Sequence, residues 1–115
     1  MQSLVLRIDP KPLTNTDADL RYEIPDRLRD ASAGMIKDSG YDYEPDTYAM
    51  HIYLSAESAE TALPFVIELL ERNALDEPNL LQAVLVGVSD LPVLESSTYR
   101  VVHPLGRSGA IGRIP

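Results

Sequence analysis

Residues 48–54 read Tyr-Ala-Met-His-Ile-Tyr-Leu, and residues 4–8 read Leu-Val-Leu-Arg-Ile. In both stretches large apolar side chains recur at every second position, which is typical of a β-strand with one face in a hydrophobic core. The predicted inward set is Leu4, Leu6, Ile8, Tyr48, Met50, Ile52 and Leu54. The same alternation predicts the outward set, which is Val5, Arg7, Ala49, His51 and Tyr53.

Two helices are predicted between and after these strands. Pro25 is tolerated best in the first turn of a helix, so we expect the first helix from about Pro25 to Ser32, after an irregular or short helical approach over 17–24. The alternative is a helix that is capped at Thr16 and kinked by Pro25. Ser55 or Ser58 can cap the second helix. Its apolar stripe is Ala59, Leu63, Val66, Ile67, Leu70 and Ala74.

Three further stretches have extended character. Met35-Ile36 begins a strand that runs into the acidic segment 38–46, the apolar run Leu80–Val88 predicts a central strand, and Tyr99–His103 fits a short edge strand. The resulting order of elements is strand, helix, strand, strand, helix, strand. We therefore predict an α+β fold, a ferredoxin-like βαββαβ two-layer sandwich with both helices on one face of an antiparallel sheet.

The chain has 115 residues, which fits one domain over residues 1–103, followed by a flexible basic tail with glycine and proline over 104–115. It contains no cysteine, which excludes disulfides, thiolate metal sites and cysteine nucleophiles and favours a reducing cytoplasm. The apolar runs fall far short of the roughly 20 residues that span a bilayer. We expect a soluble cytoplasmic protein without a membrane partner.

The charges are distributed unevenly. Residues 1–98 hold 18 acidic and seven basic side chains, a net charge of −11, whereas residues 99–115 hold three arginines and no carboxylate. An acidic body repels phosphate backbones, so we expect no nucleic-acid partner. A basic protein partner or self-association is favoured, and a small-molecule ligand stays open.

The outward sheet face carries the first group of site candidates, which is Arg7, His51 and Tyr53, joined by Tyr41 or Tyr43 if the fold brings them there. An arginine could hold an anionic group and a histidine could move a proton. The alternative is that the tail or a second subunit covers this face. Each histidine is otherwise expected at the surface or an interface, and no catalytic residue is assigned.

The acidic hairpin carries the second group, which is Asp42, Glu44 and Asp46. Its spacing resembles a calcium loop faintly, but the glycine of the sharp turn and the final bidentate glutamate of such a loop are missing. We therefore expect a solvated hairpin or an acidic patch for a basic partner, with no metal and no cofactor. In the tail, Arg107, Ile111 and Arg113 are candidates for docking into a groove.

Two functions of different classes remain. The favoured one is a small acidic protein-interaction module of the inhibitor, immunity or accessory type that binds a basic protein, because no credible catalytic constellation can be assembled. The alternative is a small-molecule-binding or catalytic domain, dimeric, with a site at Arg7, His51 and Tyr53. A blander hypothesis is an accessory subunit whose tail completes the sheet of a neighbour.

Overall fold

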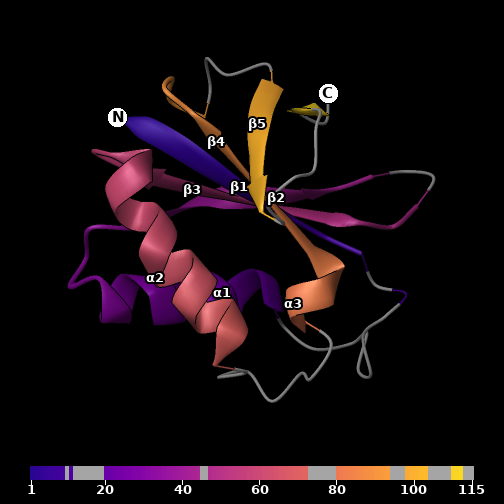
Figure 1. The fold of residues 1–115 in the computed structure, drawn as a ribbon, viewed down its shortest axis with the longest axis horizontal. Coiled ribbons are helices and arrows are strands. Elements are labelled where there is room, and N and C mark those ends of the chain that lie inside the picture. The colour runs from indigo at the N-terminus through magenta and orange to yellow at the C-terminus, as the bar shows by residue number, and fades with distance from the viewer. Residues whose placement is uncertain are drawn as a thin grey trace.

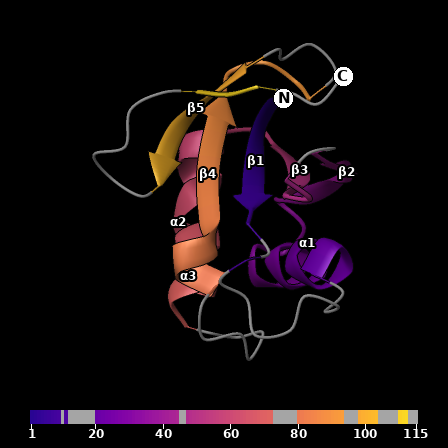
Figure 2. The same ribbon diagram turned by 90° about the vertical axis from the view of Figure 1, so that its right-hand side faces the viewer.

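A computed structural model describes residues 1–9, 11, 20–44, 47–72, 80–93, 98–103 and 110–112. The elements in chain order are β1 (Gln2–Ile8), α1 (Leu20–Ala31), β2 (Lys37–Tyr43), β3 (Met50–Ala56), α2 (Ala59–Glu71), α3 (Leu80–Ala83), β4 (Val84–Ser89), β5 (Thr98–His103) and β6 (Ala110–Gly112). The strands form one antiparallel sheet in the order β2-β3-β1-β4-β5-β6. Helices α1 and α2 lie on the same face of this sheet (Figures 1 and 2).

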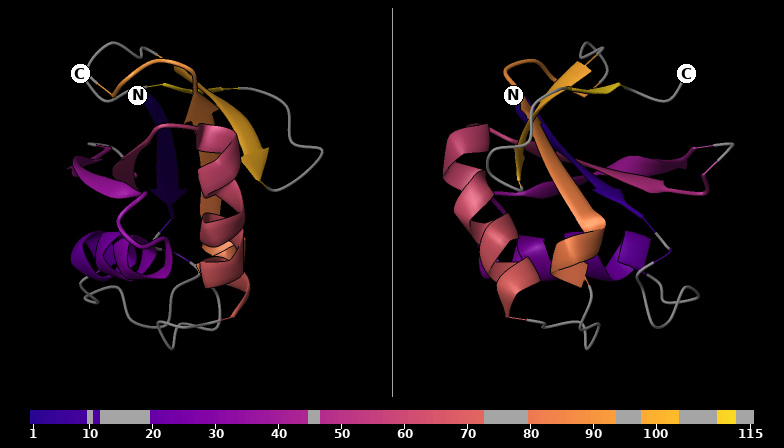
Figure 3. Two further views of the ribbon diagram at one scale, coloured as in Figure 1. Left: turned by 90° about the vertical axis from the view of Figure 1, so that its left-hand side faces the viewer. Right: turned by 45° about the vertical axis from the view of Figure 1, so that its right-hand side comes forward.

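The predicted α+β class is confirmed, whereas a simple ferredoxin-like arrangement is not. The sheet extends past β4 by two strands, and the helical turn α3 precedes β4. Strand β5 is not at the edge as predicted, because β6 pairs with its outer side and lies within the predicted tail. At the other edge, the hairpin of β2 and β3 projects beyond the neighbouring strands (Figure 3).

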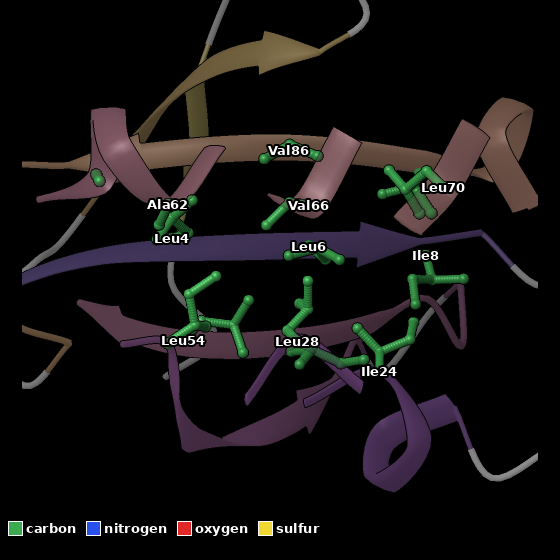
Figure 4. Close-up of a cluster of buried hydrophobic side chains, with 14 of the residues drawn as sticks. Leu4, Leu6, Ile8, Ile24, Leu28, Leu54, Ala62, Val66, Leu70 and Val86 are labelled. Atoms are coloured by element: carbon green, nitrogen blue, oxygen red, sulfur yellow. The ribbon is translucent and has the colours of Figure 1, made fainter. Parts of the chain in front are cut away.

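The main core lies between the sheet and the two long helices. The predicted inward side chains of β1, Leu4, Leu6 and Ile8, are fully buried. Figure 4 shows them between α1 and α2, and the helices contribute Ile24, Leu28, Ala62, Val66 and Leu70. Each buried side chain of this size stabilises the fold by about 1.5–3 kcal/mol, so this cluster is the main source of stability.

Helix α1 begins at Leu20, so the prediction of a start at Pro25 is wrong. Proline as the sixth helical residue lacks the N–H that would donate to the carbonyl of Arg21. The helix forms nevertheless because Ile24 and Leu28 on the same side are fully buried, and this burial outweighs one lost hydrogen bond. Helix α2 also has proline, Pro64, as its sixth residue.

Other element boundaries depend on backbone features that periodicity does not reveal. Tyr48 has a φ of 59° and is 74% exposed, so it precedes β3 instead of pointing inward. Strand β2 begins at Lys37 instead of Met35, because the chain first turns through Ala33 and Gly34, both with positive φ. The apolar run that begins at Leu80 was predicted as a strand, but it starts with the helical turn α3 and becomes a strand only at Val84. A short apolar run suits a helix as well as a strand. Of the two predicted caps of α2, Ser55 and Ser58, the cap is Ser58, whose side chain accepts a hydrogen bond from the N–H of Thr61.

The chain itself covers much of the sheet face opposite the helices, which we call the back face. Val5, Tyr53 and Tyr99 are buried there together with Val93 from the segment after β4. Tyr53 on β3 and Tyr99 on β5 are three strands apart, which is about 14 Å in a flat sheet. Their ring centroids are nevertheless 6.2 Å apart. The sheet is therefore coiled, so that β5 leans over the back face.

Candidate functional site

Arg7, Glu44 and His51 meet on the back face. Arg7 on β1 and His51 on β3 are directly opposite in the register, and Glu44 follows the end of β2. The Oε2 atom of Glu44 accepts a hydrogen bond from Nε of Arg7 at 2.5 Å and lies 2.7 Å from Nε2 of His51. Its Oε1 atom accepts from Nη2 of Arg7 at 3.0 Å and from the hydroxyl of Thr47 at 2.8 Å. The guanidinium thus binds the carboxylate through two nitrogens, the strongest geometry for such a pair.

These contacts determine the protonation of the group. The hydrogen bond from Arg7 lowers the pKa of Glu44 to about 2, burial opposes this shift, and the contacts with His51 and Thr47 add to it. The same hydrogen bond raises the pKa of Arg7. An ionised carboxylate can only accept, so Nε2 of His51 carries the proton that faces Glu44. In the neutral ring Nδ1 is then the acceptor, and the hydroxyl of Tyr53 lies 3.4 Å from it.

His51 was expected at the surface or at an interface, and its exposure of only 2% contradicts a position at the surface. It packs against Tyr53, with the ring centroids 6.1 Å apart, and Tyr53 packs in turn against Tyr99. The sequence suggested that Arg7 could hold an anionic group. In the structure the guanidinium of Arg7 is bound to the carboxylate of Glu44 instead. The chain Arg7–Glu44–His51–Tyr53, which we call the back-face network, therefore links β1 and β3 to the end of β2. Its members His51 and Tyr53 are buried, and Arg7 and Glu44 are half-buried.

A hollow of about 460 Å³ lies beside this network. Its wall includes Tyr53 and Ser55 of β3, and the hydroxyl of Ser55 is hydrogen-bonded to that of Ser39 on β2. Asp42 also lines the hollow, directly opposite His51 in the register of β2 and β3. Pro92 and Val93 form the wall on the side of β4. The volume is within the usual range for small-molecule sites.

Tyr41 and Tyr43 do not join the back face. They alternate with Asp42 and lie beside α1, where the ring of Tyr41 is 6.3 Å from that of Tyr22 and 5.9 Å from that of Tyr43. The guanidinium carbon of Arg21 lies 4.8 Å from the ring centre of Tyr22 and 5.3 Å from that of Tyr41. Nη1 of Arg21 donates to the hydroxyl of Tyr43 at 2.9 Å. We call these four residues the tyrosine–arginine cluster.

Sequence reasoning missed Arg21 and Tyr22 because it placed them before the first helix. A helix starting at Leu20 brings both residues next to β2. The contact with Tyr22 raises the pKa of Tyr41, and the hydroxyls of Tyr22 and Tyr43 raise the pKa of Arg21. The cluster therefore holds the Arg21 cation against exposed tyrosine side chains at the surface.

Asp46, Arg107 and Arg113 lie outside the described residues, and Ile111 is described only as part of the backbone of β6. In the described ranges, no three histidine or carboxylate side chains are placed to hold a metal ion. The helices of those ranges include none with the length and apolarity needed to cross a membrane. Comparisons with protein-family models, with curated proteins and with solved structures find no match. Fold and site together define a small α+β domain with a partly buried polar network on one face and an exposed aromatic cluster at one edge.

Proposed function

We propose that the protein is a small acidic interaction module, of the inhibitor, immunity or accessory type, that binds a basic protein through the tyrosine–arginine cluster. The observation that carries this proposal is the exposure of Tyr22, Tyr41 and Tyr43, which is 51%, 41% and 45%. Large aromatic side chains gathered at an exposed site mark protein-interaction surfaces. Tyrosine and arginine are also enriched among the residues that dominate binding energies.

The cluster is ordered before any partner arrives. The rings of Tyr22 and Tyr41 are inclined at 75°, and those of Tyr41 and Tyr43 at 83°, both favourable edge-to-face arrangements. Arg21 contacts all three tyrosines and limits their motion. Side chains that are already fixed lose less conformational entropy on binding, so such a surface binds more tightly than a mobile one.

The charge around the cluster supports a basic partner. Asp38 and Asp42 are exposed on β2, the strand that carries Tyr41 and Tyr43. The whole chain has a net charge of −8. Electrostatic attraction between this acidic chain and a basic protein accelerates their encounter and is screened by salt.

Tyr48 gives a further reason to place the interface at the β2–β3 hairpin. It follows the tip of the β2–β3 hairpin and is 74% exposed, and its positive φ is unfavourable for a residue with a bulky side chain. Backbone strain of this kind is concentrated at functional sites. We place Tyr48 at the rim of the proposed interface.

We also propose that the core is an elaborated ferredoxin-like sandwich. The order β2-β3-β1-β4, with α1 and α2 on one face, supports this description, and β5 and β6 are then additions to one edge. In that arrangement β2 is the outer strand at the opposite edge. An outer strand that bears exposed tyrosines is accessible to a partner without rearrangement of the sheet.

The test is affinity capture from an extract of the native host with the wild-type chain and with a Tyr41→Ser/Tyr43→Ser double variant. The matched control is Leu91→Ser, which removes an exposed apolar side chain far along the chain from the cluster. We expect a basic protein that the wild type and the control retain and that the double variant binds at least about tenfold more weakly, which corresponds to about 1.4 kcal/mol. Binding should weaken as salt is raised. A partner retained equally by all three chains, or no protein partner at low ionic strength, would contradict the proposal.

A further inference from the structure

The hollow on the back face adjoins the tyrosine–arginine cluster, because Tyr41 also lines it, but it suits a different kind of ligand. We infer that it binds a small organic cation, a primary or secondary amine carried on an apolar body. The inference goes beyond the proposed function, because it concerns the opposite face of β2 and does not require a protein partner. It rests on the shape of the hollow, on one uncompensated carboxylate and on a rigid polar floor.

The wall of the hollow suits an apolar body of limited size. Its volume of about 460 Å³ accommodates a ligand with one ring and a short chain. Val93 and Tyr53 are almost completely buried and Pro92 is half-buried, so their positions are set by packing. The aromatic face of a tyrosine attracts a cation that comes within about 6 Å of the ring centre.

Asp42 supplies the charge that selects a cation. Residues directly opposite in an antiparallel pair have their side chains on the same face, so Asp42 shares the back face with His51. Glu44, the nearest carboxylate along the chain, is already compensated by Arg7. Met1, which carries the α-ammonium of the chain, also lines the hollow. In the described part of the chain Asp42 forms no ion pair, with that ammonium or with another group, so it can bind the ammonium of a ligand directly. An anionic ligand would meet this carboxylate and the negative body together and is disfavoured.

The floor of the hollow is rigid and polar. Tyr53 is only 3% exposed, and its hydroxyl is oriented by His51, which is held by Glu44. The hydroxyls of Ser39 and Ser55, which also line the hollow, are hydrogen-bonded to each other. Each hydroxyl oxygen has two acceptor lone pairs, so the serine pair can also accept a hydrogen bond from an ammonium. Groups that are held in place by a second layer of contacts bind with little reorganisation.

The test is a titration of the full chain, followed by the amide signals of ¹⁵N-labelled protein, with three probes that share one carbon skeleton. The probes are 2-phenylethylamine, 2-phenylethanol and phenylacetate, which are cationic, neutral and anionic. We expect the amine to shift the amides of Gly40, Tyr53 and Val93 and to bind at least about fivefold more tightly than the alcohol, which corresponds to about 1 kcal/mol. Phenylacetate should cause no shift at these positions.

Two variants separate recognition by Asp42 from a general effect of negative charge. Asp42→Asn should weaken binding of the amine at least about fivefold and leave that of the alcohol unchanged. Glu71→Gln removes a carboxylate from the exposed end of α2 and should change neither. Both side chains are exposed, so the variants should fold, and the dispersion of the amide signals verifies this. Equal binding of the three probes, no binding of the amine, or equal weakening by both variants would overturn the inference. The proposed function is tested separately, by partner capture with the Tyr41→Ser/Tyr43→Ser variant, so failure of this inference is distinguishable from failure of the proposed function.

Discussion

Nε2 of His51 lies 2.7 Å from Oε2 of Glu44, and the same oxygen accepts a hydrogen bond from Nε of Arg7. One carboxylate thus connects the end of β2 to both β1 and β3. The contact anchors the hairpin that carries Asp42 on one face and Tyr41 on the other. Both proposed sites therefore depend on the position that this carboxylate gives to the hairpin.

Replacing the carboxylate should destabilise the protein more than an ordinary surface change. Glu44→Gln removes the ion pair with Arg7 and leaves His51 buried beside a neutral amide. We expect the free energy of unfolding to fall by about 2–4 kcal/mol, measured by urea denaturation. The control is Glu68→Gln, which breaks the exposed pair with Arg72 and should cost less than about 0.5 kcal/mol. Equal losses in the two variants would contradict the structural role of Glu44.

The stability should also depend on pH in a way that Glu44 explains. Its pKa is about 2 in the folded protein, below the ordinary value of 4.5. A carboxyl group with a lowered pKa stabilises the fold fully above its unfolded pKa, and that contribution is lost as the pH falls through the folded pKa. Between about pH 5 and pH 2 the wild type should therefore lose about 2 kcal/mol more than Glu44→Gln, allowing for partial screening by solvent. Parallel curves for the two proteins would show that the lowered pKa does not contribute.

Tyr48 should be replaceable with a gain in stability. A bulky residue with a φ of 59° is strained, and asparagine tolerates this conformation better. Tyr48→Asn should raise the free energy of unfolding by about 0.5–1 kcal/mol. Ala33→Gly, at the other described non-glycine residue with positive φ, should have a similar effect. If Tyr48 belongs to the rim of the interface, its replacement also weakens partner binding, whereas that of Ala33 does not. A loss of stability in both variants would contradict the strain.

The prolines of the two helices allow a paired comparison. Pro64→Ala restores an N–H that can donate to the carbonyl of Glu60, and the side chain is exposed, so little packing is lost. We expect stabilisation by about 1 kcal/mol, seen as a higher Tm. Pro25 is the sixth residue of α1 in the same way but is buried, so Pro25→Ala also removes core contacts and should gain less. A larger gain at Pro25 would show that its burial contributes little.

Much of the fold could be predicted because strand alternation is a local property. The pattern of residues 4–8 correctly placed Leu6 toward the core and Arg7 on the other face, together with His51. The boundaries of elements could not be predicted as well. Leu20 belongs to a helix despite Pro25, because burial of neighbouring side chains outweighs the missing hydrogen bond. No single-sequence pattern reports that burial.

The candidate sites divide in the same way. The sequence left open whether Tyr41 or Tyr43 joins the back face, and it did not indicate that Asp42 would lie there opposite His51. Glu44 was predicted only as part of an acidic hairpin, and its binding to Arg7 spans 37 positions of the chain. Such contacts depend on strand order and register, which short-range periodicity does not contain.

By itself, the sequence determined the α+β class, the inward and outward faces of β1 and of most of β3, and the acidic charge of the body, because these follow from periodicity and composition. Only the tertiary structure decided that β5 coils over the back face, that one carboxylate holds Arg7 and His51, and that Arg21 meets three exposed tyrosines. The physical reason is that these contacts join elements distant in the chain. Their formation depends on the packing of the whole sheet against its helices.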